Sequence, residues 1–372
     1  MKNDYKQDIK YDYWWAGMER AYHGRMKQIA QAVGSARRLF EMDREELVLI
    51  DGISEKYADD IIIKRRKWDI DKEYDKLLET GIDFIPFYDV RYPKRLSGIP
   101  GHPFALFLLG ELPPDDRLSV AVIGTRNCSQ YGRMMAARFG SDLASYGVSV
   151  VSGMAYGIDG IGQEAALNAG GMSYAVLGCG VNRCYPASNK RLYERLKEQG
   201  GIISEYGLHT EPAAALFPPR NRIISALSDA VLVVEAREKS GTMITVDMAL
   251  EQGREVCVVP GRITDPLSTG CIKLWKQGAT PVTCAEDIMY MLDEMFEINR
   301  KKAEPEVVEL PAVQKCLYEH LEPYAKSIGQ LSDETQTDFR EAVCALVELC
   351  VKGLACETGK GYYVRIKECK AV

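Results

Sequence analysis

The sequence predicts an α/β protein with a helical N-terminal part, a central parallel β-sheet and a small C-terminal domain. Six short apolar runs recur through the middle of the chain, and most of them end in Gly, Ser or Thr. Segments with helical spacing separate these runs, as in YGRMMAARFGSDLASYG and NKRLYERLKEQG. Alternation of buried strand and helix is typical of a parallel sheet covered on both faces. The length of 372 residues is too great for one ordinary domain, so two or three are expected.

The charge and the cysteine content of the chain limit the kinds of ligand site that it can have. The formal net charge of −6 and the pI near 5.5 argue against a general polycation, so any nucleic acid must bind at a local basic patch. The 11 Cys include no CxxC pair, and the four His show no zinc-ligand spacing, so no metal site is expected. Cys128, Cys179 and Cys257 lie in or beside apolar runs and are interpreted as buried thiols of a protein in the reducing cytoplasm.

Neither a signal peptide nor a membrane span is expected. Residues 1–13 alternate charged residues and Tyr, unlike a secretory leader. No apolar run reaches the roughly 18 residues of a membrane-spanning helix.

Residues 1–80 are predicted to form a helical domain. Gly34 is expected to end one helix, and Asp43, with two acidic residues soon after it, to begin another. A turn at Gly52 with Ser54 as the next N-cap resembles a helix-hairpin-helix. An ordinary helical hairpin is the favoured interpretation of this segment.

Residues 81–118 are predicted to be a connector that packs on the next domain, because FALFLL is too apolar to remain in water. The central domain is placed at residues 119–295. Its strands are expected near 120–124, 148–153, 174–180, 202–206, 230–236 and 255–261. Since ligands bind beyond the carboxyl ends of parallel strands, the loops there should converge on one crevice.

Small, hydroxyl-bearing and basic residues follow the first, second and fifth of these strands. They are Gly124, Thr125 and Arg126; Ser152 and Gly153; and Lys239, Ser240, Gly241 and Thr242. Ser129 is the expected N-cap of the helix after the first strand, and the amides of that helix would face an anion. Gly124 opens no G-x-G-x-x-G fingerprint and the chain has no P-loop. The loops therefore indicate a phosphate-bearing ligand, with no cofactor expected.

The segment 217–225, FPPRNRIIS, combines an aromatic residue, two prolines and two arginines at a helix start. Arg220 and Arg222 carry guanidinium forks suited to phosphate. Asn221 can cap a helix or bond a base edge, and Phe217 offers a flat face for stacking. The alternative is an ordinary helix start with solvated arginines and a core Phe.

Several motifs, in order, resemble the DNA-processing protein A (DprA or Smf) family. They are VAVIGTRNCSQYG, VVSGMAYGID, YAVLGCGVNRCYPASNKRLY, GGIISEY, FPPRNRIISALSDAVLVVEAREKSGTMIT, ALEQGREVCVVPG, and LSTGC with LWKQGA, spanning roughly residues 119–290. The resemblance implies an extended Rossmann-like domain, an N-terminal helical domain of the SAM or helix-hairpin-helix kind, and a C-terminal winged-helix-like domain. It further implies a dimer without enzymatic activity, which binds single-stranded DNA and passes it to the RecA recombinase during natural transformation.

The resemblance also implies which residues meet the DNA. Arg126, Lys190 with its neighbour Asn189, Phe217, Arg220, Asn221, Arg222 and Lys239 would line a groove. Gly124, Thr125, Ser152, Gly153, Ser240, Gly241 and Thr242 would offer amides and hydroxyls to phosphate. Cations along a groove and an aromatic ring for base stacking are what sequence-tolerant strand binding needs. Tyr185 is a second candidate for stacking, with a simple turn at Tyr185-Pro186 as the open alternative.

The sequence departs from the family pattern in three places. Tyr156 stands where members usually have Arg, Gly162-Gln163 where they have Ala-His, and Ala213–Ala215 where a basic residue is frequent. Two possible phosphate contacts are therefore absent, and if each is a real contact, the affinity of this chain for DNA should be weaker and less dependent on salt than that of relatives.

Residues 296–310 are interpreted as a linker and residues 311–372 as a winged-helix-like domain of three helices and a hairpin. Thr337 is the expected N-cap of the third helix and Gly353 its stop. This helix carries acidic and basic residues in nearly equal number. It is therefore predicted to contact protein rather than to read DNA, and its deletion to leave strand binding largely intact.

The sequence leaves two other functions open. SGT before a helix also resembles the nucleotide-cleaving lysine-decarboxylase-like (LOG) proteins, in which Glu205 or Glu235 could act as a general acid or base. Capping or pairing with Arg222 is the favoured interpretation of these two carboxylates. A pure protein scaffold is the other alternative. Helices at 242–251 and 284–295 could form a dimer surface, although core burial explains their apolar faces equally well.

Overall fold

The computed structural model describes residues 5–18, 25–296, 307–322, 324–365 and 370–371. The chain divides into two compact units, Met1–Ile298 and Asn299–Val372. No helix in the described part of the chain has the length and apolarity that crossing a bilayer requires.

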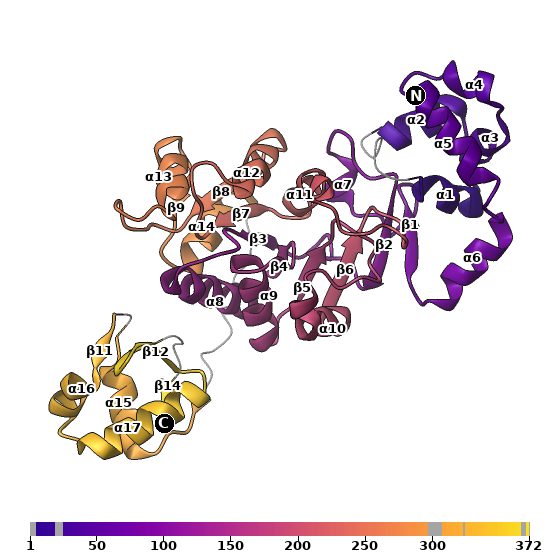
Figure 1. Ribbon diagram of the computed structural model, residues 1–372. Coiled ribbons are helices and arrows are strands. Elements are labelled where there is room, and N and C mark those ends of the chain that lie inside the picture. Colours follow the sequence, from indigo (N-terminus) through magenta and orange to yellow (C-terminus); the bar gives the residue numbers. More distant parts are fainter. Residues whose placement is uncertain (1–4, 19–24, 297–306, 323, 366–369, 372) are drawn as a thin grey trace. The chain divides into compact units, whose positions relative to one another are not determined.

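The larger unit is built on a nine-stranded sheet with the order β1-β2-β6-β5-β4-β3-β7-β8-β9 (Figure 1). Its six central strands coincide with the six apolar runs: β3 (Ser119–Ile123), β4 (Ser149–Ser152), β5 (Ser173–Val176), β6 (Gly200–Ser204), β7 (Ala230–Val233) and β8 (Glu255–Val258). These strands and the short β9 (Thr280–Pro281) run parallel. β2 (Ala105–Gly110) and β1 (Asp83–Pro86) add an antiparallel edge. The sheet is thus mostly parallel, as predicted.

Both faces of the sheet are buried. Along β3, Val120 and Val122 belong to one apolar cluster, whereas Ala121 and Ile123 belong to another, because successive side chains point to opposite faces. The helices that accompany the sheet are α7 (Lys94–Ser97), α8 (Gln130–Ser145), α9 (Ile158–Asn168), α10 (Lys190–Glu198), α11 (Phe217–Ala226), α12 (Gly241–Glu251), α13 (Thr269–Lys276) and α14 (Ala285–Phe296). The predicted covering of both faces is confirmed.

The direction in which strands are added reverses between β3 and β7. From β3 the chain adds β4, β5 and β6 on one side, and β7, β8 and β9 on the other. Such a reversal is the usual place for a ligand crevice in an open parallel sheet. The loops 124–129 and 234–240 leave neighbouring strands at this point.

The N-terminal part is helical as far as it is described. Its helices are α1 (Ile9–Ala16), α2 (Met26–Val33), α3 (Ala36–Glu41), α4 (Arg44–Val48), α5 (Glu55–Arg65) and α6 (Ile70–Glu79). Gly34 ends α2 with a φ of 96°, Asp43 begins α4 in a capping box, and Ser54 caps α5. All three predicted boundaries are confirmed. Tyr13 packs against Phe84 and Phe107 of the sheet edge, at ring-centroid distances of 5.6 and 6.0 Å.

The described part of the smaller unit contains three helices, α15 (Ala312–His320), α16 (Ile328–Thr335) and α17 (Phe339–Val351). Its strands β11 (Lys326–Ser327), β13 (Tyr362–Arg365) and β12 (Ala355–Gly359) form an antiparallel sheet in that order, and β10 (Val307–Val308) pairs with β14 (Lys370–Ala371). The prediction of Thr337 as the N-cap of α17 is wrong by one residue. The Asp338 carboxylate accepts from the amides of Arg340 and Glu341 instead, because a short acidic side chain reaches those amides directly. Most of the predicted linker 296–310 lies outside the described residues.

Candidate nucleic-acid interface

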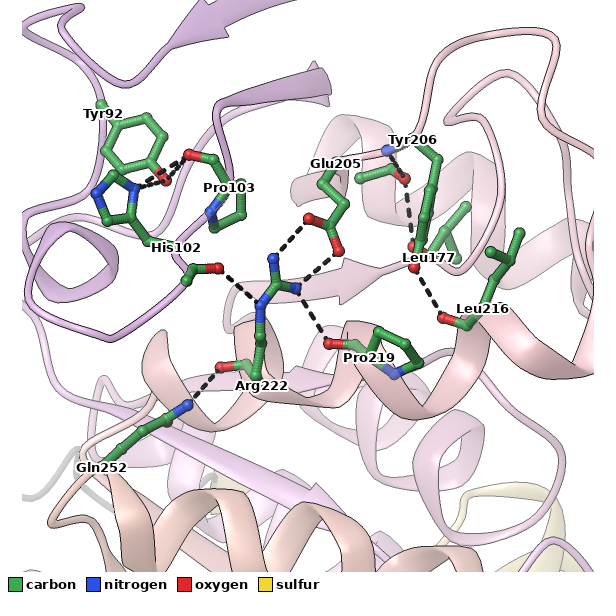
Figure 2. A network of polar contacts seen from close by, with 12 residues as sticks. Tyr92, His102, Pro103, Leu177, Glu205, Tyr206, Leu216, Pro219, Arg222 and Gln252 are labelled. Atoms are coloured by element: carbon green, nitrogen blue, oxygen red, sulfur yellow. Dashed lines mark hydrogen bonds and ion pairs between the residues drawn. The ribbon is translucent and has the colours of Figure 1, made fainter. Parts of the chain in front are cut away.

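Two aromatic rings stack beyond the carboxyl ends of β5 and β6. The centroids of Tyr185 and Phe217 lie 5.5 Å apart, with their planes inclined by 17°. Tyr185 comes from the loop between β5 and α10, and Phe217 is the first residue of α11. The Tyr206 hydroxyl donates to the Leu216 carbonyl at 3.1 Å, which fixes the chain just before Phe217 (Figure 2). With Tyr185 42% exposed, the pair offers an aromatic surface to solvent.

Arg126 lies against the same pair. Its guanidinium carbon is 5.5 Å from the centroid of Phe217, a cation–π distance. The residue is exposed, and the described part of the chain provides no salt-bridge partner for it. Arg126 therefore keeps its donors available for a phosphate.

Arg220 forms the floor beneath the rings. It is 5% exposed and donates to the carbonyl oxygens of Val176 and Gly153, the latter at 3.3 Å. Burial lowers its pKa to about 10, while the neighbouring Asp159 carboxylate acts in the opposite direction. A Cβ on Gly153 would come within 2.7 Å of this guanidinium and 2.9 Å of the Asp159 carboxylate, so glycine leaves room for both side chains as they are placed. Asn221 accepts from the Arg220 Nε at 3.2 Å and helps to hold it.

Arg222 points toward the Glu205 carboxylate, and both side chains are largely buried (Figure 2). Two of its nitrogens donate to the Glu205 carboxylate at 2.7 and 2.6 Å, and its Nε donates to the Gly101 carbonyl at 3.0 Å. The side chains of this pair are 13% and 2% exposed. Burial by itself lowers the pKa of Arg222, but the Glu205 carboxylate outweighs that effect and the pKa is raised. The favoured interpretation of Glu205, pairing with Arg222, is confirmed.

Asn189 and Lys190, which begin α10, play different parts. Asn189 donates from its side-chain amide to the carbonyls of Met154 and Ala155, at 3.0 and 3.4 Å, and so holds the loop after β4. Lys190 is exposed and pairs with Glu194 at 2.5 Å, one turn further along the helix. Its charge is accessible but already partly compensated.

The small residues after the strands serve close packing. Ser152 is fully buried and its hydroxyl donates to the Val122 carbonyl at 2.7 Å. The Thr125 amide donates to the Glu235 carbonyl at 2.8 Å. A Cβ on Gly124 would lie 2.8 Å from that same carbonyl oxygen. These contacts are internal to the protein.

The N-terminus of α8 faces an anion that the chain itself supplies. Ser129 is its N-cap, as predicted, and accepts from the Gly132 amide at 3.0 Å. The Glu235 carboxylate accepts from the Ser129 amide at 2.9 Å and from the Ser129 hydroxyl. Glu235 is 1% exposed. Capping, the favoured interpretation of Glu235, is confirmed. The Glu235 carboxylate occupies the place beside the strand reversal where a nucleotide phosphate would bind.

The loop 239–242 is separate from the aromatic pair. Lys239, Ser240, Gly241 and Thr242 line neither of the two hollows described below. Lys239 is exposed, whereas Thr242 is buried and the Ser240 hydroxyl has no partner in the described part of the chain. The structure thus does not place these four residues in the hollows where Arg126 and Gly153 lie.

Two adjoining hollows lie over the strand ends. The first, an aromatic pocket of about 50 Å³, is lined by Arg126, Gly153, Ala155, Tyr156, Leu177, Gly178, Cys179, Tyr185, Pro186, Phe217 and Arg220. The second, a groove of about 560 Å³, is lined by Arg126, Asn127, Arg133, Ala155, Tyr156, Gly157, Gly160, Ile161, Glu164, Ser188, Asn189, Arg191 and Leu192. Within the described residues, no group of three or more His, Cys, Asp or Glu is placed to hold a metal ion.

Sequence reasoning missed Arg133 and Arg191, and it treated Tyr156 only as a departure from the family pattern. Tyr156 is 51% exposed and lines both hollows. Their positions in the sequence could have indicated both arginines, because Arg133 and Arg191 lie in the first turns of helices that follow strands. Gln163 is fully buried and bonds the Met154 amide and the Tyr174 carbonyl, both at 3.0 Å. Gln163 therefore has a structural role, in which it links the loop after β4 to β5.

Comparison with known proteins finds relatives along the central part of the chain. The protein Smf of Escherichia coli strain K12 is 47% identical over 206 residues, which are 55% of this chain and 55% of that protein. The chain thus matches about half the length of that relative. The DNA processing protein DprA of Bacillus subtilis strain 168 is 39% identical over 228 residues, 61% of this chain and 76% of the relative.

Solved structures give the same result. The X-ray structure of DprA from Streptococcus pneumoniae superposes with a TM-score of 0.65 at 31% identity, covering 77% of this chain and 98% of that one. DprA from Helicobacter pylori, described for its single-stranded DNA binding mode, superposes with a TM-score of 0.52 at 28% identity, covering 57% of this chain and 96% of that one. The family model for DNA recombination-mediator protein A matches residues 83–293. The chain belongs to the DNA recombination-mediator protein A family, whose members include DprA and Smf.

Proposed function

We propose that the chain binds single-stranded DNA, with little dependence on base sequence, at the stack of Arg126, Phe217 and Tyr185. The observation that carries this proposal is a stacked aromatic pair, in which Tyr185 is exposed and Phe217 half-buried, beside the exposed Arg126 guanidinium, which has no salt-bridge partner in the described structure. Every base has a face that can stack on an aromatic ring, so such a site tolerates any sequence. The binding mode described for the H. pylori relative supports the same ligand.

The proposed contacts fall into two groups. Arg126, Tyr185, Lys190 and Phe217 meet the strand directly, because all four are partly or fully accessible. A second group shapes the site from within, namely Gly124, Thr125, Ser152, Gly153, Asn189, Arg220 and Asn221. Arg222 is left out, because Glu205 and backbone carbonyls occupy its donors. Residues 239–242 could be reached only by a strand that extends beyond the aromatic pocket.

We further propose that the chain acts in DNA recombination as a homodimer that delivers the strand to a RecA recombinase, as in natural transformation. Membership of a family described as recombination mediators supports this role. A mediator needs a strand-binding site that releases its cargo, and sequence-tolerant stacking with few ionic contacts suits that purpose. The homodimer and the RecA partner rest on family membership.

The smaller unit is proposed to be a winged-helix-like module that contacts protein. On α17, Phe339, Val347 and Val351 are 54%, 49% and 85% exposed. A helix that reads DNA would present cations there instead. Removing residues 305–372 should therefore leave the affinity for single-stranded DNA nearly unchanged. Loss of most of the binding on that deletion would refute the assignment.

We propose that the chain has no enzymatic activity. In the alternative, a nucleotide hydrolase of the LOG kind, Glu205 or Glu235 would act as the general acid or base. Both carboxylates are buried, one held by Arg222 and the other by the N-terminus of α8. Neither lines the aromatic pocket or the groove, which speaks against a reaction at either carboxylate. Release of free base from a nucleoside monophosphate would support the hydrolase.

The test is fluorescence anisotropy with a labelled single-stranded oligonucleotide and its duplex over a salt series, for the wild type and Arg126→Ala. We expect preference for the single strand, an affinity that falls as salt rises, and a weakening of about tenfold or more in the variant. Equal or absent binding in both proteins would refute the proposal. The assay for base release would then be the next measurement.

A further inference from the structure

The groove beside the aromatic pocket is not explained by the stack of Arg126, Phe217 and Tyr185. Its volume of about 560 Å³ is far larger than that of the pocket, about 50 Å³, and falls within the range of roughly 300–1,000 Å³ typical of ligand sites. Arg126, Ala155 and Tyr156 line both hollows. A ligand that leaves the pocket past Tyr156 therefore enters the groove.

Two arginines on different helices border this groove. Arg133 lies in the first turn of α8, and Arg191 is the second residue of α10. Both are exposed, and the described structure gives neither of them a salt-bridge partner. Lys190, next to Arg191, is by contrast paired with Glu194. The two guanidiniums are therefore available to an external anion.

The charge of the groove is unbalanced. Arg126, Arg133 and Arg191 face a single lining carboxylate, that of Glu164. The whole chain has a net charge of −6, so its surface as a whole does not attract nucleic acid. The three arginines of the groove form a local positive site of the kind that a phosphate backbone requires. Cations on two separate helices suit an extended polyanion better than one small anion. Tyr156, half-exposed at the junction, adds a ring on which a base can stack.

We propose that the groove holds the continuation of the DNA strand and that Arg133 and Arg191 bind two of its phosphates. The strand then runs from Tyr185 and Phe217, past Tyr156, to the first turns of α8 and α10. This inference rests on the proposed binding of single-stranded DNA and extends it by giving the strand a path. It also gives the strand cationic contacts beyond the stack of Arg126, Phe217 and Tyr185.

The experiment compares two double variants of the full chain. Arg133→Ala with Arg191→Ala removes the proposed contacts. Arg138→Ala with Arg195→Ala removes the same charge from the same two helices, at positions that do not line the groove. Binding of a labelled oligothymidine of about 16 nucleotides, the upper end of site sizes known for small strand-binding domains, is measured over a salt series. Circular dichroism verifies that both variants fold.

The expected result is a difference between the two variants. Losing two phosphate contacts should make the slope of log affinity against log salt shallower by about 1.4, at about 0.7 per contact for single strands. Affinity at low salt should fall at least about tenfold relative to the control variant. Equal behaviour of the two variants would overturn the inference while wild-type binding still upheld the proposed function. Absence of wild-type binding would overturn both.

A protein ligand is the competing occupant. If the groove accepted an acidic peptide, the Arg133 and Arg191 variant would lose binding to labelled polyglutamate but would keep wild-type affinity for the oligothymidine. That outcome would overturn the inference. Loss of oligothymidine binding, with no binding of polyglutamate by the wild type, would uphold it.

Discussion

Arg126 and Arg222 are residues of the same type that serve different purposes in neighbouring parts of the fold. Both were predicted from the sequence to meet phosphate. Arg126 is exposed, its guanidinium carbon lies 5.5 Å from the Phe217 ring centroid, and no carboxylate among the described residues forms a salt bridge with it. Arg222 is 13% exposed and is held by the nearly buried Glu205. The difference shows that a basic motif gives the chemistry of a residue, while a carboxylate brought in by the fold decides whether that chemistry faces outward or inward.

The largest effect is expected at the inward-facing arginine. Glu205→Ala leaves the Arg222 guanidinium buried without its partner, which should lower the free energy of unfolding by about 3–5 kcal/mol. The affinity of the folded fraction for single-stranded DNA should stay unchanged. Urea denaturation followed by circular dichroism measures the change in stability. The control is Glu211→Ala, which breaks the exposed pair with Arg183 and should cost less than about 1 kcal/mol. Equal stability of the two variants would contradict the structural role of Arg222.

The next effect concerns the ring on which Arg126 lies. Phe217→Ala removes one member of the aromatic stack and should weaken strand binding by about 1–3 kcal/mol. Phe217→Tyr keeps the ring and should bind nearly as the wild type does. Anisotropy at fixed salt distinguishes the two variants. If Ala and Tyr bind alike, stacking at this position is unimportant.

A smaller effect should follow Arg126→Lys. The charge is retained, so the slope of affinity against salt should not change. The planar fork that lies over Phe217 is lost, which should cost about 0.5–1 kcal/mol of binding. A salt series measures both quantities at once. An unchanged affinity together with an unchanged slope would contradict the role of the planar fork and make Arg126 a simple point charge.

The smallest effect is expected at Lys190. Because Glu194 already pairs with it at 2.5 Å, Lys190→Ala should weaken strand binding by less than about fivefold, the scale of an exposed ion pair. Isothermal titration with the oligonucleotide can quantify the loss. A decrease as large as that for Arg126→Ala would place Lys190 among the main contacts. It would also mean that Lys190 leaves Glu194 when the strand binds.

The N-terminus of α8 teaches the same lesson as the two arginines. The sequence correctly indicated that its amides would face an anion, with Ser129 as N-cap. It could not decide between an external phosphate and the Glu235 carboxylate, which is 106 residues further along the chain. Similarly, Ser152 and Gly153 were singled out for phosphate, yet their contacts are with Val122 and Arg220. Small residues at strand ends serve close packing as readily as ligand binding.

By itself, the sequence determined the parts of this protein that depend on local patterns. Apolar runs placed the six central strands, capping residues placed helix ends such as Gly34 and Ser54, and ordered motifs identified the family. The tertiary structure alone decided which arginines are free, since carboxylates distant in the chain are brought to some and not to others. It also brought Arg133 and Arg191, which are 58 residues apart in the chain, to one groove. Periodicity and caps are encoded within a few residues, whereas charge pairing and exposure arise only when distant segments pack together.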